Sequence, residues 1–175
     1  ATGPLMTKLA AEVADGMMMH PFSSERYLKE VTLPAIKSGL HNSGRDLKSF
    51  ELDYAPMIAS ADSEEELQRA IGLIKSRIAF YGCTVAYKPV LDIHGWGDLQ
   101  DELIALNRQH RTQEMSDLIT DDILETIAIV GTPEAVVDKM IERFDGCIGR
   151  TGFAVEGLES GRKRELIEKL RLSDQ

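Results

Sequence analysis

The sequence predicts an α/β fold with parallel strands, and three observations lead to that prediction. Short apolar runs alternate with amphipathic helix patterns along the whole chain. The first run, residues 17–19, has no polar alternation, which is typical of a parallel strand buried on both faces. The 175 residues hold only three such runs, whereas a closed eight-stranded barrel takes about 250 residues. We therefore expect the chain to be part of a larger α/β domain.

The first third of the chain predicts a helix, the strand at 17–19 and a second helix. Pro4 suits the first helical position, where its missing N–H is not needed. Ser23 or Ser24 can cap the second helix, and Pro34 predicts a kink or a restart within it. The expected apolar face of the first helix consists of Leu5, Leu9 and Val13.

The middle third predicts one strand and then mostly helix. Residues 50–59 are expected to form the second strand, and residues 63–66 form a capping box that begins a helix. The apolar stripe of this helix consists of Leu67, Ala70, Ile71, Ile74 and Ile78. Residues 82–97 are irregular, and residues 98–128 are expected to be helical in two or three pieces. The expected starts of these pieces are Asp98, Ser116 and Asp121.

The last third predicts a helix, a strand and a closing helix. Residues 132–134 combine a capping threonine, a first-position proline and an acid that favours the positive end of the helix dipole. The buried face of this helix is expected to hold Val136, Val137, Met140, Ile141 and Phe144. Residues 148–155 are expected to form the third strand, and residues 162–170 the last helix.

Composition excludes several function classes. The formal charge of −9 argues against a nucleic-acid partner, which needs clustered Lys and Arg. No apolar run approaches the roughly 18 residues of a membrane span. The two cysteines, Cys83 and Cys147, form no disulfide framework, so a reducing cytoplasm is the expected location. The four histidines show neither HxH nor HExxH spacing, so no metal site is expected.

Ligands of α/β proteins bind at the C-terminal ends of the strands, and the start of the chain is one such place. If a strand precedes Ala1, the N–H groups of Thr2 and Gly3 and the Thr2 hydroxyl point at the helix start. That arrangement suits a phosphate; the alternative is that Gly-Pro simply begins a helix. The chain also opens in mid-pattern without an initiator Met, which predicts a piece of something larger.

Two further candidates follow later strands. His20 comes directly after the first strand and is a candidate acid, base or ring-stacking neighbour of a cofactor. The alternative is a strand-end histidine bonded to a backbone carbonyl. Arg150, in or after the third strand, is a candidate for binding an anionic substrate or cofactor tail, and a surface ion pair is the alternative.

Several segments together resemble one family. Residues 1–4, 9–16 and 17–20 are similar to the segment that links the fifth and sixth barrel strands of the luciferase-like monooxygenase superfamily, and residues 130–136 resemble its late "GTPEEV" helix start. Residues 20–22, 80–81, 87–90 and 94–98 resemble the branch that uses a deazaflavin coenzyme, factor 420, in place of FMN.

The resemblance implies a fold and a set of binding residues. The fold is the C-terminal half of a (β/α)8 TIM-type barrel over residues 1–175, with a helical insertion at about 86–128. The phosphate of the coenzyme would contact Ala1, Thr2 and Gly3, and His20 would line the same cavity. The early strands that supply most ring contacts and the acid–base residues lie outside this chain, so no catalytic residue is assigned.

The resemblance also implies an activity and partners. The expected function is hydride transfer between the deazaflavin and a small organic substrate, whose identity the sequence does not reveal. The alternatives are an FMN-dependent monooxygenase and a non-catalytic, truncated flavin-binding barrel. The expected partners are a homo-oligomeric copy or the missing N-terminal half, because an open strand edge favours pairing.

Overall fold

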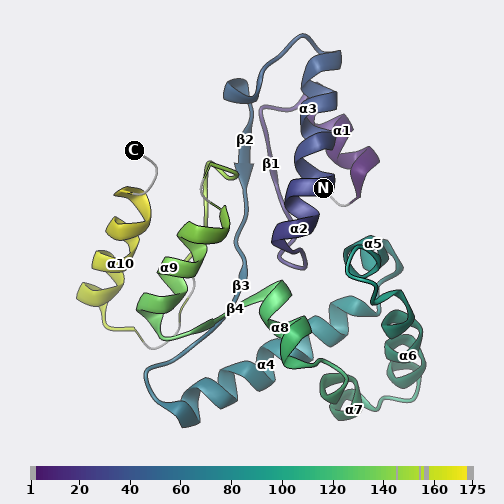
Figure 1. The fold of residues 1–175 in the computed structure, drawn as a ribbon, viewed down its shortest axis with the longest axis vertical. Coiled ribbons are helices and arrows are strands. Elements are labelled where there is room, and N and C mark those ends of the chain that lie inside the picture. Colours follow the sequence, from purple (N-terminus) through teal and green to yellow (C-terminus); the bar gives the residue numbers. More distant parts are fainter. Residues whose placement is uncertain (1–2, 145, 154, 156–157, 173–175) are drawn as a thin grey trace.

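In the part of the chain that the structure describes, four short parallel strands lie at the centre (Figure 1). The computed structural model describes residues 3–144, 146–153, 155 and 158–172. Strand β1 (Gly16–Met18) pairs with β2 (Glu51–Asp53), and β3 (Met57–Ser60) pairs with β4 (Ala128–Gly131), both in parallel. Helices connect and cover the strands, so the predicted α/β class with parallel strands is confirmed.

The helices after β1 show how the chain accommodates a proline. Helix α2 (Glu25–Tyr27) continues through a wide π-helical turn (Leu28–Thr32) into α3 (Leu33–Asn42). Pro34 has no N–H to donate to the preceding turn, and a π turn is a common way to absorb such a break. The predicted change at Pro34 thus takes the form of a π turn before it: α3 begins at Leu33, one residue earlier than Pro34, and the backbone stays helical between the two segments.

Helix α1 (Pro4–Val13) forms as predicted but buries a different face. It packs on α3 through Thr7 and Ala11, and the approach is close at Gly39, where a Cβ atom would lie 2.3 Å from the Lys8 carbonyl oxygen. Small residues make this close approach possible, so the small side of α1 faces α3. The expected apolar face was wrong, because its three residues are the exposed ones: Leu5 (83%), Leu9 (47%) and Val13 (75%).

The expected single strand at 50–59 is two strands with different partners. Residues 54–56 separate β2 from β3, and Pro56 has no N–H with which to continue a ladder. The sequence pattern misses the strand β4, because residues 128–131 follow a helical region without a break. The pairing of β3 with β4 over four residue pairs is the tertiary contact that makes this segment extended.

In the described C-terminal part, both predicted helices form but the predicted strand does not. Helices α9 (Pro133–Phe144) and α10 (Ser160–Leu172) confirm the two predicted helices. In the described part of 148–155, the expected third strand is reduced to one isolated parallel bridge between Asp53 and Arg150, so that prediction was wrong. In Figure 1, α9 and α10 flank β2 on the side opposite α1 and α3.

The expected helical insertion is confirmed. Helix α4 (Glu64–Gly82) begins at the predicted cap Ser63, whose hydroxyl accepts the Glu66 N–H. The insertion then consists of α5 (Lys88–Asp92), α6 (Gly97–Arg108), α7 (Thr112–Asp117) and α8 (Asp121–Ile127). The expected start at Ser116 was wrong, because α7 begins at Thr112. Figure 1 shows α4 to α8 gathered at the C-terminal ends of the strands, with α5 near α2.

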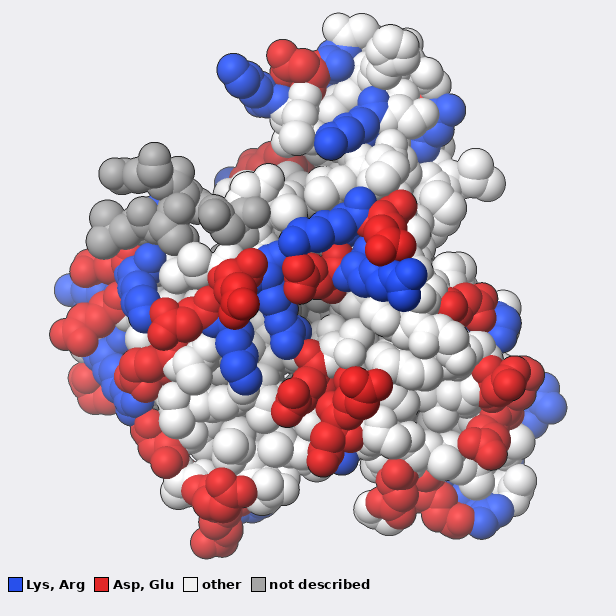
Figure 2. Space-filling model, in the orientation of Figure 1, with Lys and Arg blue, Asp and Glu red and all other residues white. Residues whose placement is uncertain are grey.

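The two faces of the β1–β2 sheet differ in chemistry. Met17 and Leu52 are paired in register and point into the core formed with α1 and α3. Their neighbours Met18 and Glu51 are exposed, because successive side chains of a strand alternate between faces. Figure 2 shows acidic and basic side chains interspersed over the face that it presents. No helix in the described part of the chain is long and apolar enough to cross a membrane.

Candidate functional site

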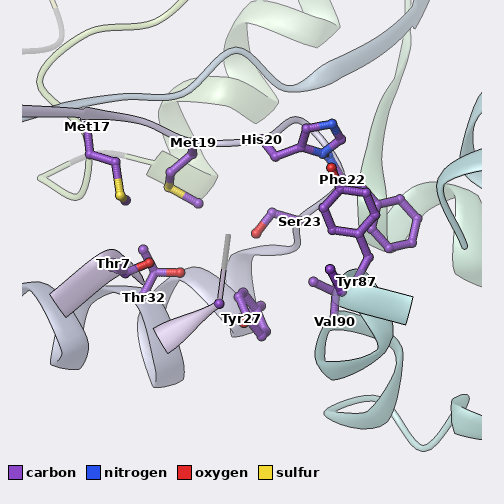
Figure 3. Close-up of a pocket in the computed structure, with 12 residues that line it drawn as sticks. Thr7, Met17, Met19, His20, Phe22, Ser23, Tyr27, Thr32, Tyr87 and Val90 are labelled. Carbon is purple, nitrogen blue, oxygen red and sulfur yellow. The ribbon is translucent and has the colours of Figure 1, made fainter. Parts of the chain in front are cut away.

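A small pocket lies at the C-terminal end of β1, where α1 begins and the insertion approaches (Figure 3). Its cavity volume is about 30 Å³. Helix α1, the loop after β1 and the π turn supply hydroxyl side chains to the lining, and β1 and the insertion supply apolar ones. The residues that line the pocket are Gly3, Thr7, Met17, Met19, His20, Phe22, Ser23, Tyr27, Thr32, Ala86, Tyr87 and Val90.

Gly3 supplies the turn into α1. It is the residue before the helix, and its φ of 78° and ψ of 158° fall in a region that essentially only glycine occupies. Pro4 has no N–H, and the next two amides, of Leu5 and Met6, have no acceptor within the helix. The positive end of the helix dipole and these amides therefore lie beside the pocket, an arrangement that favours an anion.

Three buried hydroxyl side chains face β1 across the pocket. Thr7 comes from α1, Ser23 from the loop after β1, and Thr32 from the π turn, and each is at most 4% exposed. Figure 3 shows the Ser23 hydroxyl directed into the space between Met19 and the two threonines. The Ser23 Oγ has no hydrogen-bond partner in the described part of the chain. A buried hydroxyl without a partner costs about 1–3 kcal/mol, so the pocket is suited to a ligand or water that supplies one.

His20 is held from three sides. Its Nδ1 accepts the backbone N–H of Phe22 at 3.1 Å. The ring stacks on Tyr87, with centroids 4.5 Å apart and planes 22° apart, and it lies perpendicular to the Tyr81 ring, with centroids 4.6 Å apart. Burial lowers the pKa of His20, because the charged imidazolium loses hydration. His20 is therefore a neutral, oriented ring and not a cation at neutral pH.

Polar contacts join the insertion to the residues that follow β1. Ser24, which caps α2 by accepting the Tyr27 N–H, lies 2.8 Å from His94 Nε2. The Arg26 guanidinium donates to the Ile93 carbonyl oxygen at 2.7 Å. His94 stacks on Trp96, and its burial lowers the pKa of His94, with Arg26 adding to the effect. These contacts fix Tyr87 and its helix relative to β1.

The predicted binding residues divide into three groups. Ala1 and Thr2 lie outside the described residues. Gly3 and His20 line the same pocket, as the resemblance implied. Arg150 is elsewhere: its side chain is 66% exposed, and its Nε lies 2.7 Å from a carboxylate oxygen of Glu51, at the start of β2. The structure thus shows the ion pair, and anion binding by Arg150 stays a prediction.

Sequence reasoning missed most of the pocket. It gave Ser23 no role beyond a helix cap, yet Ser24 is the cap and Ser23 is the unpartnered hydroxyl. Tyr81 and Tyr87 were not connected with His20, because they are distant in sequence and no local pattern joins them. Within the residues that the structure describes, no group of three His, Cys, Asp or Glu side chains is placed to hold a metal ion.

Comparison with known proteins relates this chain to one family. The family model described as luciferase-like monooxygenase matches residues 1–149. An uncharacterized protein of Mycobacterium tuberculosis is 41% identical over 150 residues, which cover 86% of this chain and 44% of that protein. A 5,10-methylenetetrahydromethanopterin reductase of Methanopyrus kandleri is 33% identical over 147 residues, covering 81% of this chain and 39% of the reductase.

Solved structures agree on the fold. The coenzyme F420-dependent tetrahydromethanopterin reductase of Methanopyrus kandleri superposes with a TM-score of 0.75 at 22% identity, covering all of this chain and 50% of the reductase. An F420-dependent secondary alcohol dehydrogenase superposes with a TM-score of 0.61 at 18% identity, covering 47% of that chain. This chain thus spans about half the length of the relatives that it matches. From the family match over residues 1–149, the chain belongs to the luciferase-like monooxygenase family.

Proposed function

We propose that this chain forms one wall of the deazaflavin site of a luciferase-like oxidoreductase, whose reaction is hydride transfer to or from a small organic substrate. The observation that carries the proposal is the pocket at the end of β1, which brings together the Gly3 turn, the Ser23 hydroxyl and the His20 ring. The two solved structures of similar fold, which are named as F420-dependent enzymes, support the choice of cofactor. We propose further that the chain corresponds to the C-terminal half of the barrel and that hydride transfer requires the other strands.

The residues present fit a cofactor with an anionic tail and uncharged polar groups. The amides at the start of α1, beside Gly3, suit a phosphate. The orphaned Ser23 hydroxyl and the neighbouring Thr7 and Thr32 suit uncharged oxygens, and none of the described residues that line the pocket is charged. When bound, a deazaflavin supplies a two-electron hydride carrier, while the protein supplies position and electrostatics. In that division, this chain binds, orients and partly excludes water.

A titration with matched glycine variants tests the proposal. The purified chain is titrated with coenzyme F420, followed by its fluorescence, and with FMN in parallel. We expect Gly3→Ala to weaken deazaflavin binding about 10-fold or more, about 1.4 kcal/mol or more, because an L-residue is strained at this φ. Gly44→Ala is the control: Gly44 also has a positive φ, of 69°, a Cβ atom added there would meet nothing within 4 Å, and it is not among the lining residues. Equal loss in both variants, or no binding by the wild type, would contradict the proposal.

The family description also supports a second candidate, an FMN-dependent monooxygenase that activates oxygen. The same pocket would serve it, so the cofactor decides between the two reactions. Tighter binding of FMN than of the deazaflavin in the parallel titration would favour the monooxygenase. Binding of either cofactor without turnover after the barrel is completed would favour the third alternative, a non-catalytic flavin-binding protein.

The exposed apolar face of α1 supports association with a further part of the barrel or with a second copy. Leu5 and Val13 are largely exposed on the side of α1 that faces away from α3. Size-exclusion chromatography with light scattering measures whether the chain self-associates, and Leu5→Ser is expected to weaken that association. A cytoplasmic location is proposed with it, because Cys83 and Cys147 are free thiols.

A further inference from the structure

Three groups hold the side chain of His20: one backbone N–H and two aromatic rings. The Phe22 backbone N lies 3.1 Å from Nδ1, the ring centroid of the stacked Tyr87 lies 4.5 Å from that of His20, and the centroid of the perpendicular Tyr81 ring lies 4.6 Å from it. Tyr87 precedes α5, so one of the three comes from the helical insertion and not from the barrel. The insertion therefore contacts a residue that lines the proposed cofactor site.

The hydrogen bond to Nδ1 determines where the ring carries its proton. A backbone N–H only donates, so Nδ1 must accept with its lone pair and the neutral ring carries its proton on Nε2. Protonation of Nδ1 would break this bond. The titratable groups in contact with the ring are the phenols of Tyr81 and Tyr87, and no charged side chain of the described residues lines the pocket. The surroundings thus favour an uncharged imidazole.

We infer that Tyr87 is a positioning residue, whose ring holds His20 in the neutral tautomer protonated on Nε2. The role of this tautomer at a cofactor rests on the proposed function. At a deazaflavin site, His20 would donate a hydrogen bond through Nε2 as an uncharged ring, and would not act as a charged acid. The stacked geometry carries the assignment, because the Tyr87 ring holds the imidazole in the plane in which Nδ1 accepts the Phe22 N–H.

The tautomer is measured directly by long-range ¹H–¹⁵N correlation of the histidine rings at neutral pH, without cofactor. We expect a single neutral form of His20 with the proton on Nε2 in the wild type and in Tyr87→Phe, which keeps the stacked ring. Tyr87→Leu fills part of the volume without an aromatic face, and there we expect a mixture of tautomers and a pKa nearer the ordinary value. Val85→Ala is the matched control, because Val85 lies in the same short segment and is 71% exposed.

Each outcome bears on the inference. A His20 ring protonated on Nδ1 or charged in the wild type would overturn it, even if a variant failed to fold. An unchanged tautomer in a folded Tyr87→Leu variant, or a failure of Tyr87→Phe to preserve it, would overturn it too. A second titration with coenzyme F420 separates this inference from the proposed function. Absence of binding by the wild type would refute the proposed function and leave the tautomer result standing, whereas an approximately 10-fold weaker affinity of Tyr87→Leu alone would support both.

Discussion

The close packing of α1 on α3 allows a prediction about replacing glycine by alanine. The replacement should destabilise the fold at Gly39 and stabilise it at Gly72. At Gly39, a Cβ atom would lie 2.3 Å from the Lys8 carbonyl oxygen and 2.8 Å from the Ala11 Cβ. These are a backbone atom and a short side chain, so neither can yield unless the helices separate. At Gly72, in the exposed middle of α4, a Cβ atom would meet nothing within 4 Å.

The magnitudes follow from two opposing effects. Replacing Gly by Ala inside a helix stabilises it by about 0.5–1 kcal/mol, whereas overpacking typically costs about 1–3 kcal/mol. We therefore expect Gly39→Ala to lower the free energy of unfolding by about 1–2 kcal/mol. For a chain of this size, the melting temperature would fall by about 2–8 °C. Gly72→Ala has only the favourable effect and should raise the free energy of unfolding by about 0.5–1 kcal/mol.

Urea unfolding followed by circular dichroism measures both variants against the wild type. The slope of the transition should stay the same, because the surface exposed on unfolding is unchanged. A Gly39→Ala protein as stable as the wild type would show that α1 and α3 do not cross as closely as the structure places them. A destabilised Gly72→Ala protein would show that α4 is not an exposed helix at that position.

Three further predictions concern the polar contacts. Ser24→Ala should lower the free energy of unfolding by about 1–2 kcal/mol, because α2 loses its cap; an unchanged urea midpoint would contradict this. The fold lowers the pKa of His94 below its ordinary value of 6.5, so the free energy of unfolding should be highest above pH 6.5 and should fall as the pH drops below that value. His94→Gln should make the free energy of unfolding less dependent on pH in this range. Arg162→Gln should lower the melting temperature at neutral pH, less so in high salt, because Arg162 binds both Asp62 and Glu134. These bonds lower the pKa of both carboxyls, so the difference should vanish as the pH falls through those lowered values.

The elements that could be predicted from the sequence are those with local signals. The capping box at Ser63 and the first-position prolines of α1 and α9 mark helix starts by local chemistry, and the structure begins those helices there. The missed strand β4 has no such signal. Four residues, 128–131, are too short for a periodicity to distinguish a strand from the end of a helix, and only the partner β3 makes them extended.

The same limit applies to the pocket. Gly3 and His20 could be predicted, because their positions before a helix and after a strand follow from the order of elements. The face of α1 that packs on α3 could not, since periodicity identifies an apolar stripe without saying which neighbour covers it. The contact of Tyr87 with His20 depends on how the insertion folds back, which is a property of the tertiary structure alone.

The π turn at Leu28–Thr32 holds one residue more than a regular α-helical turn. Because its hydrogen bonds run from i to i+5 instead of i to i+4, the extra residue is taken up within the turn, and the helix on either side keeps its orientation. Deletion of one residue here should therefore restore regular α winding without displacing the Ser23 loop relative to α3. Insertion of a further residue would rotate that loop by about 100° relative to α3, so natural variation in the length of this segment should consist of the loss of one residue and not the gain of one.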